Sequence, residues 1–248
     1  MNSFPRFFSH ATVALGLSAL AAGCAAPVPD YRDIVAAPDR SEADRKNDQR
    51  RNPVALFGFT GARPGMKVLD MGAGGGYSTE MLARAVAPGG VVYSQAPADL
   101  FPNARKAYAV RALTAAMKHA VRLERPFDDP LPPGIGDFDL VTFFFFYHDT
   151  VWLEVDRAKM NRRLYEALKP GGILVVADHS ARPGDGANVT KSLHRIEESV
   201  VRRELEAAGF QFVAAGDFLR NPADARDTPV SKNPVPNDEF VLKYRKPQ

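Results

Sequence analysis

Apolar and polar positions alternate in blocks from residue 64 to the C-terminus. Short apolar runs rich in Val, Leu and Phe are separated by segments in which apolar residues recur at helical spacing. The pairs Pro88-Gly89 and Pro170-Gly171 mark turns between a helix and the next strand. Because strands that alternate with helices form parallel sheets, this pattern predicts an α/β fold with helices on both faces.

Seven strands and four helices are expected in this region. The predicted strands are 67–71, 90–95, 120–124, 138–146, 172–178, 209–216 and 239–245. The predicted helices are 78–86, 103–117, 156–168 and 195–208. Residues 217–238 are rich in Pro, Asn and Asp and should form a long loop, a kind of segment that often has a function.

The segment 66–78 joins an apolar run, an acid and a cluster of glycines. The run ends at Asp70, glycines follow at positions 72, 74, 75 and 76, and a helical pattern starts near Ser78. A glycine turn between a strand and a helix lets the backbone approach a ligand closely. No lysine follows the glycines, so the segment is not a P-loop, and Tyr77 stands where the dinucleotide fingerprint needs a glycine.

The spacing that fits is D-x-G-x-G-x-G, formed by Asp70, Gly72, Gly74 and Gly76. It resembles motif I of the class I S-adenosylmethionine (SAM)-dependent methyltransferases. The resemblance implies SAM as the cofactor and a Rossmann-like, doubly wound, mostly parallel seven-stranded sheet with a C-terminal antiparallel strand. The acid would face the amino group of the methionine part of SAM.

Two further cofactor positions follow from the same resemblance. After the second strand the family usually has an acid that binds the ribose hydroxyls, but here the strand ends at the uncharged Gln95. Asp99 is a possible substitute, or simply an acid near the start of a helix. Asp128 occupies the loop in which the family contacts adenine, and its alternative role is that of a turn residue before Pro130.

Histidines follow the fourth and fifth strands. The fourth strand ends in Tyr147-His148-Asp149 and the fifth in Asp178-His179-Ser180. Ligands bind at the carboxyl ends of strands in open α/β sheets. His148 and His179 are therefore candidate bases for deprotonating a methyl acceptor, with a structural role for each as the alternative.

Three short segments carry a narrower resemblance. Asp178-His179-Ser180, His194-Arg195-Ile196 and Leu219-Arg220-Asn221-Pro222 look like a bacterial group of predicted, often exported methyltransferases, over about residues 39–246. We expect His179, His194 and Arg220 to converge above the cofactor, which makes His194 a third candidate catalytic residue. Helix capping and loop ordering are equally open roles for these residues.

A metal ion is chemically compatible with the same region. Imidazole and carboxylate groups suit divalent ions, and His148, Asp149, Asp178 and His179 offer both. No pair of these residues has a dedicated metal-binding spacing, however, so the sequence predicts no metal site.

The N-terminus has the pattern of an export signal. Arg6 precedes an apolar stretch at 11–22, which is too short to cross a bilayer that needs about 20 apolar residues. Leu20–Cys24 resembles a bacterial lipobox, although Ala21 stands where leucine is usual. We expect a signal peptide at 1–23, a tether at 24–38 and a SAM-dependent methyltransferase-like domain at 39–248.

This pattern predicts an exported, periplasmic lipoprotein that is anchored to the membrane through a lipid on Cys24. Cleavage by ordinary signal peptidase, which would give a soluble exported protein, is the alternative. Cys24 is the only cysteine, so neither an intramolecular disulfide nor a thiolate metal site can form.

Charge adds little to these expectations. The 32 basic and 29 acidic residues give a net charge of +3, without a long basic run, so no nucleic-acid partner is expected. Residues 39–51 are almost wholly polar. Ser41 could cap a short solvated helix there, but a charged surface segment that Pro53 ends is the favoured interpretation.

Three functions remain. The favoured one is an enzyme of EC 2.1.1 type that transfers a methyl group from SAM to an unidentified small-molecule acceptor. The alternative is an exported binding or scaffold protein that has the fold without turnover, an idea motivated by the export signal and by Gln95. A dehydrogenase is disfavoured because Tyr77 interrupts the dinucleotide fingerprint.

Overall fold

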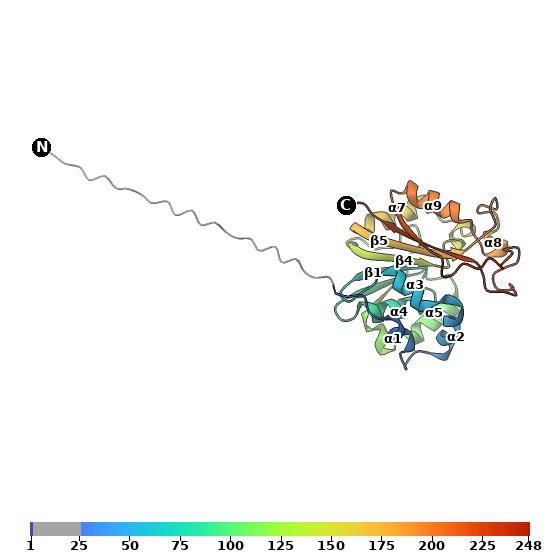
Figure 1. Ribbon diagram of the computed structural model, residues 1–248. Coiled ribbons are helices and arrows are strands. Elements are labelled where there is room, and N and C mark those ends of the chain that lie inside the picture. Colours follow the sequence, from blue (N-terminus) through green and yellow to red (C-terminus); the bar gives the residue numbers. More distant parts are fainter. Residues whose placement is uncertain (2–25) are drawn as a thin grey trace.

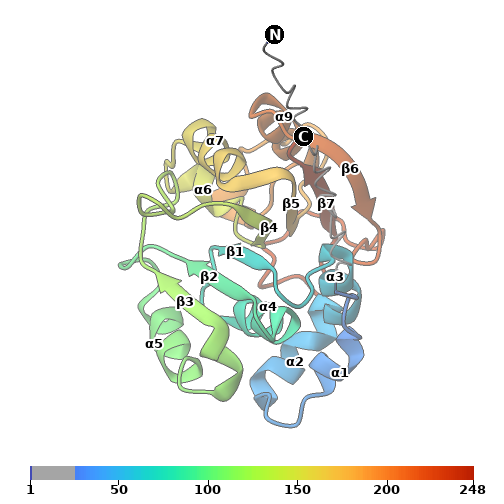
Figure 2. The ribbon, with the colours of Figure 1, turned by 90° about the vertical axis from the view of Figure 1, so that its left-hand side faces the viewer.

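A seven-stranded sheet in the order β3-β2-β1-β4-β5-β7-β6 forms the centre of the protein, with helices on both faces (Figures 1 and 2). The structure is a computed structural model that describes Met1 and residues 26–248. The expected signal peptide and Cys24 therefore lie outside the described residues. No helix in the described part of the chain combines the length and apolar character needed to cross a membrane.

The strands confirm the predicted fold class. They are β1 Lys67–Met71, β2 Val91–Gln95, β3 Ala120–Leu123, β4 Phe138–Phe144, β5 Leu168–His179, β6 Gln211–Gly216 and β7 Glu239–Arg245. β7 runs antiparallel to its neighbours β5 and β6, and the other neighbouring strands pair in parallel.

Two helical layers cover the sheet, as Figure 2 shows. One layer holds α1 Tyr31–Ala36, α2 Glu42–Arg51, α3 Pro53–Thr60, α4 Tyr77–Val86 and α5 Pro102–Arg111, followed by the 3₁₀ helix η1 Ala115–His119. The other holds α7 Arg157–Ala167 and α9 Glu198–Ala207, and the short helices α6 Asp149–Trp152 and α8 Thr190–Leu193 follow β4 and β5. Each face of the sheet has its own buried apolar cluster.

The folded domain begins earlier than residue 39. Asp30 caps α1 by accepting a hydrogen bond from the backbone N–H of Arg32 at 2.8 Å. Tyr31 is buried in the apolar cluster, and its hydroxyl donates to the carbonyl of Ala62 at 2.9 Å. The prediction of a tether over 24–38 is therefore wrong for residues 30–36, because one buried aromatic ring anchors this Ala- and Pro-rich segment.

Residues 42–51 of the polar segment form α2 with Ser41 as its cap, which was the less favoured alternative to a charged surface segment, and this helix is not merely solvated. The Ser41 hydroxyl accepts a hydrogen bond from the N–H of Asp44 at 3.1 Å. Asp44 is buried and accepts two hydrogen bonds from the Arg111 guanidinium, at 2.6 and 2.8 Å. Arg111 also donates to the carbonyl of Gly75 at 2.9 Å and pairs with Glu80, so α2, α4, α5 and the glycine loop share one cation.

The long loop at 217–238 is fixed by a buried arginine. Arg195 is fully buried and donates to Asp224 at 2.8 Å and to the carbonyl oxygens of Ser180 and Thr228 at 3.1 and 3.2 Å. Breaking such a buried pair leaves an uncompensated charge. Arg195 thus has an ordering role, which the sequence analysis left open for its neighbour His194.

Candidate functional site

The candidate site lies where the carboxyl ends of β1, β4 and β5 meet. Asp70 on β1 pairs in register with Thr142 on β4, and Phe144 on β4 pairs with Ala177 on β5. Parallel pairing therefore brings the glycine loop after β1, residues 145–149 after β4 and residues 178–180 after β5 to one edge of the sheet.

Asp70 is a buried carboxylate that holds this edge together. Its two oxygens accept hydrogen bonds from the hydroxyls of Thr79 and Thr142, at 2.7 and 2.9 Å. Burial raises the pKa of Asp70 to about 6, and these two hydrogen bonds offset part of that shift. Both carboxylate oxygens of Asp70 thus accept hydrogen bonds within the protein, and the side chain is buried.

The glycine loop has the backbone conformation that the sequence predicted. Gly72, Gly74 and Gly76 have φ values of +64°, +49° and +84°. A Cβ on Gly72 would lie 3.1 Å from the side chain of Phe146, and one on Gly76 would lie 2.9 Å from Tyr108, so packing excludes side chains there. At Gly74 the nearest atom to an added Cβ is 3.9 Å away, which leaves that face of the loop open.

Three phenylalanines close the space above the loop. Phe146 stacks on Phe127 with ring centroids 5.1 Å apart and meets Phe101 edge-on at 5.6 Å. The cavity between these rings, Gly72 and Gly74 has a volume of about 10 Å³, which is room for about one water molecule. Phe101 has a φ of +56°, a conformation that costs free energy for a residue with a side chain.

A larger pocket of about 430 Å³ adjoins this closed cavity, because Leu100 and Phe127 line both. Asp99 and Asp128 both line the pocket. The structure thus brings together two acids that the sequence analysis considered separately as cofactor ligands. The carboxylate of Asp128 also accepts a hydrogen bond from the ammonium group of Lys159 at 3.0 Å.

Gln95 is not available to bind a ribose. Its side chain is fully buried, its Oε1 accepts a hydrogen bond from the N–H of Gly72 at 3.3 Å, and its Nε2 donates to the carbonyl of Arg125 at 2.6 Å. Both ends of the amide are therefore used inside the protein. Gln95 ties the glycine loop to the segment after β3.

Arg51 is a site residue that the sequence analysis missed. Its guanidinium carbon lies 4.9 Å from the ring centroids of both Tyr77 and Phe145, at the end of α2. Its Nε is buried without a hydrogen-bond partner, and burial lowers the pKa of the group, with the charge of Arg50 adding to the effect. Nothing in the polar run 39–51 distinguishes this arginine from its neighbours, because its role depends on rings that come from other elements.

His148 is held between two carboxylates. Its Nδ1 donates to Asp178 at 2.7 Å, and its Nε2 lies 3.1 Å from Oδ1 of Asp149. Burial favours the neutral ring, but these two carboxylates outweigh it and raise the pKa of His148 to about 10. A histidine that keeps its proton at neutral pH is a poor general base, so the geometry does not favour the predicted role of His148.

His179 and His194 both lie close to His148, whereas Arg220, which was expected to converge with them, does not share this cluster. The ring centroids of His179 and His194 lie 5.7 and 5.4 Å from that of His148. Nδ1 of His179 is 2.9 Å from Glu239, although without the angle of a hydrogen bond, and the side chain of His194 is 43% exposed. Arg220 lies apart from the three rings, with its guanidinium on Ser180, Glu198 and Asp238.

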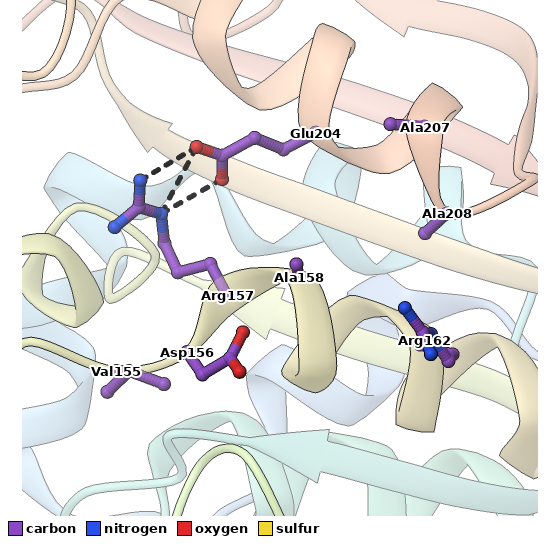
Figure 3. A pocket seen from close by; sticks show the side chains of 8 residues that line it. All are labelled: Val155, Asp156, Arg157, Ala158, Arg162, Glu204, Ala207 and Ala208. Carbon is purple, nitrogen blue, oxygen red and sulfur yellow. Dashed lines mark hydrogen bonds and ion pairs between the residues drawn. The ribbon is translucent and has the colours of Figure 1, made fainter.

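Another cavity, of about 490 Å³, lies between α7 and α9 (Figure 3). Arg157 and Glu204 form an ion pair at 2.8 Å beside it. None of the predicted site residues lines this cavity, so we place the candidate site at the strand ends.

Comparison with known proteins shows what the chain is similar to as a whole. Residues 69–176 match a family model described as a methyltransferase domain. The chain is 28% identical over 168 residues to the ubiquinone/menaquinone biosynthesis C-methyltransferase UbiE of Ectopseudomonas mendocina, an alignment that covers 67% of this chain and 57% of UbiE. It is 31% identical over 119 residues to the hybrid PKS-NRPS synthetase poxE of Penicillium oxalicum, covering 46% of this chain but only 3% of poxE. It thus spans only part of these relatives.

A solved structure shows the same fold. The crystal structure of a SAM-dependent methyltransferase from Aquifex aeolicus superposes with a TM-score of 0.58 at 18% identity, covering 82% of this chain and 96% of that one. At this level of identity the likeness concerns the fold.

Asp70 generates a prediction for stability against pH. Its pKa of about 6 in the folded state lies above the ordinary aspartate value of 3.8. The native state therefore binds the proton more tightly, and stability falls as pH rises through this interval. Between pH 4.5 and pH 7 the wild type should lose about 2 kcal/mol relative to Asp70→Asn, whose amide does not titrate. Urea unfolding at both pH values measures the difference. Asp99→Asn is the control for removal of an exposed carboxylate, and equal slopes for all three proteins would contradict the prediction.

Proposed function

We propose that this protein, whose residues 69–176 match a methyltransferase-domain model, transfers a methyl group from SAM to a small-molecule acceptor. The comparisons support SAM as the cofactor. The observation that carries the proposal is the open backbone at Gly74 together with Arg51, whose Nε is buried without a hydrogen-bond partner, at the same sheet edge. The acceptor is not identified by this geometry.

The described residues fit the two ends of SAM. The guanidinium of Arg51 is a binding group for the carboxylate of the methionine part. The pocket of about 430 Å³ beside Asp99 and Asp128 is within the size range of small-molecule sites and suits the adenosine part. Bound SAM supplies an electrophilic methyl group on a sulfonium sulfur, so the task of the protein is to position the two substrates.

Phe101 must move for the cofactor to lie across the glycine loop, because the present cavity holds about one water molecule. Its strained φ of +56° makes such a movement less costly than displacement of a relaxed residue. We propose that the segment 96–101 shifts when SAM binds.

His179 is the base that we propose for the acceptor. Glu239 lies 2.9 Å from its Nδ1 and can orient the ring. With Nδ1 buried beside this carboxylate, Nε2 is the nitrogen that we propose takes the proton of the acceptor. The ring of His179 also stacks on Phe145, and Phe145 contacts Arg51. The proposed base and the arginine that we propose binds SAM therefore lie on either side of one phenylalanine.

A protein of this fold that binds a ligand without turnover is the second candidate function. The closed cavity above Gly72 and the fully committed amide of Gln95 favour it. Fold alone does not decide between an enzyme and a binding protein.

Calorimetry with SAM and S-adenosylhomocysteine tests the cofactor. Micromolar binding to the wild type should be lost in Gly74→Val, because the valine side chain would enter the open face and φ at this position is +49°. Gly58→Ala is the matched control, since a Cβ at that helical position meets no atom within 4 Å, and it should bind as the wild type does. Absence of binding to folded wild-type protein would leave the second candidate function.

Arg51→Gln tests which part of SAM this arginine binds. Loss of one charge-assisted contact should weaken SAM binding by about tenfold or more. Affinity for 5′-methylthioadenosine, which lacks the amino-acid part, should stay within about twofold. If both ligands weaken equally in calorimetry, Arg51 supports the pocket and does not bind the carboxylate.

We also propose that the protein is exported and anchored through a lipid on Cys24, as the first 24 residues suggest. Fractionation of cells should place the wild type with the membranes and Cys24→Ala in the soluble fraction. Membrane attachment of Cys24→Ala would contradict the anchor.

A further inference from the structure

Three potential metal ligands converge where α6 meets the C-terminal end of α8. Nε2 of His148 lies 3.1 Å from Oδ1 of Asp149 and 3.3 Å from Nδ1 of His194. Nδ1 of His194 lies 3.3 Å from the same Asp149 oxygen. The three atoms therefore form a nearly equilateral triangle.

The size of this triangle matches a bound transition metal. Donors at about 2.1 Å from an ion are separated by about 3.0 Å at octahedral angles and by about 3.4 Å at tetrahedral angles. All three separations lie between these limits. Two imidazoles and one carboxylate are the donor set of catalytic zinc(II) sites and of non-haem iron(II) sites, and both kinds of site leave at least one coordination position open.

Neighbouring groups fix the ligands in the required orientation. Asp178 accepts hydrogen bonds from both Nδ1 and the backbone N–H of His148, each at 2.7 Å. This contact directs Nε2 of His148 toward the centre of the triangle, as carboxylates do for histidines that bind metals. Trp152 donates its indole N–H to Oδ1 of Asp149 at 2.7 Å and orients that carboxylate.

His194 provides access to the triangle. It caps α8 in the left-handed conformation with a φ of +54°, which is costly for a residue with a side chain. This conformation places its ring edge against His148, while 43% of the side chain stays exposed. His148 and Asp149, by contrast, are buried, so an ion would enter from the His194 side.

We propose that His148, Asp149 and His194 bind one divalent transition-metal ion, of the zinc(II) or iron(II) class, with Asp178 as a positioning residue. The ligand set differs from the one considered from the sequence, because His179 lies against Glu239 and Asp178 acts through His148. The ion needs neither SAM nor an acceptor, so the proposal stands apart from the methyltransferase function. Its open positions would accept water or an oxygen atom of an acceptor.

Cobalt(II) is the probe for this site. The full-length purified protein, stripped with a chelator, is titrated with Co²⁺ while visible absorption is recorded, and zinc(II) competition follows. We expect one equivalent to bind with d–d bands of a site that contains nitrogen and oxygen donors, and zinc(II) to displace it. The melting temperature should rise with metal concentration, because the ion binds the folded state.

Single substitutions distinguish the residues that bind the metal from the residue that only positions them. His194→Ala removes an exposed donor and should abolish the bands, whereas Asp178→Asn keeps all three donors and should weaken binding by about 10- to 100-fold. His119→Ala is the matched control, since that histidine lies on η1 with its Nδ1 near the carbonyl of Gly90, and it should bind as the wild type does. Circular dichroism verifies that each variant is folded.

The proposal is overturned if stripped wild-type protein binds no Co²⁺ at millimolar concentration, or if His194→Ala binds it as tightly as the wild type. Since metal binding is measured without SAM, this result is independent of the calorimetry on Gly74→Val. A protein that binds the metal but not SAM would support the site and contradict the methyltransferase.

Discussion

The parallel register of β1, β4 and β5 is the constraint on which the site depends. It sets Asp70 beside Thr142 and brings the segments after β4 and β5 together. Asp70, with its two hydroxyl partners, then fixes the end of β1 to β4 and to the start of α4. A carboxylate in this buried position is costly, and its raised pKa expresses that cost.

The strand ends divide into two regions with different chemistry. On one side lie the glycine loop, the cation of Arg51 and the pocket beside Asp99 and Asp128. On the other side lie three histidines and their carboxylates. Phe145 separates the regions, since its ring contacts both Arg51 and His179. Under the proposed function, the methyl donor on the Arg51 side and the methyl acceptor on the His179 side would meet next to Phe145.

The sequence predicted the seven strands and the four helices between them, but it did not predict the helices α1, α3, α6 and α8. It predicted the roles of individual residues less well. The seven strands and the glycine turn can be predicted from local patterns. Strands appear as apolar runs, and backbone with a positive φ favours glycine. The roles of Gln95 and Arg51 depend on partners 23 or more residues away in the chain, such as Gly72 and Phe145. The convergence of His148, Asp149 and His194 likewise depends on the left-handed backbone conformation of His194, which the neighbouring residues in the sequence do not predict.

The hydrogen bonds of Arg111 with Asp44 and with the carbonyl of Gly75 show which residues belong to the packed domain. The stretch that matches the methyltransferase-domain model starts at residue 69, yet Asp44 and Arg51 on α2 lie before it. Arg111 donates hydrogen bonds both to Asp44 and to the carbonyl of Gly75 in the glycine loop. A fragment that starts at residue 69 would therefore lose the carboxylate that pairs with Arg111, and it would also lose Arg51. The packed domain is therefore larger than the segment that matches the family model, and it includes the residues from the α1 cap Asp30 onward.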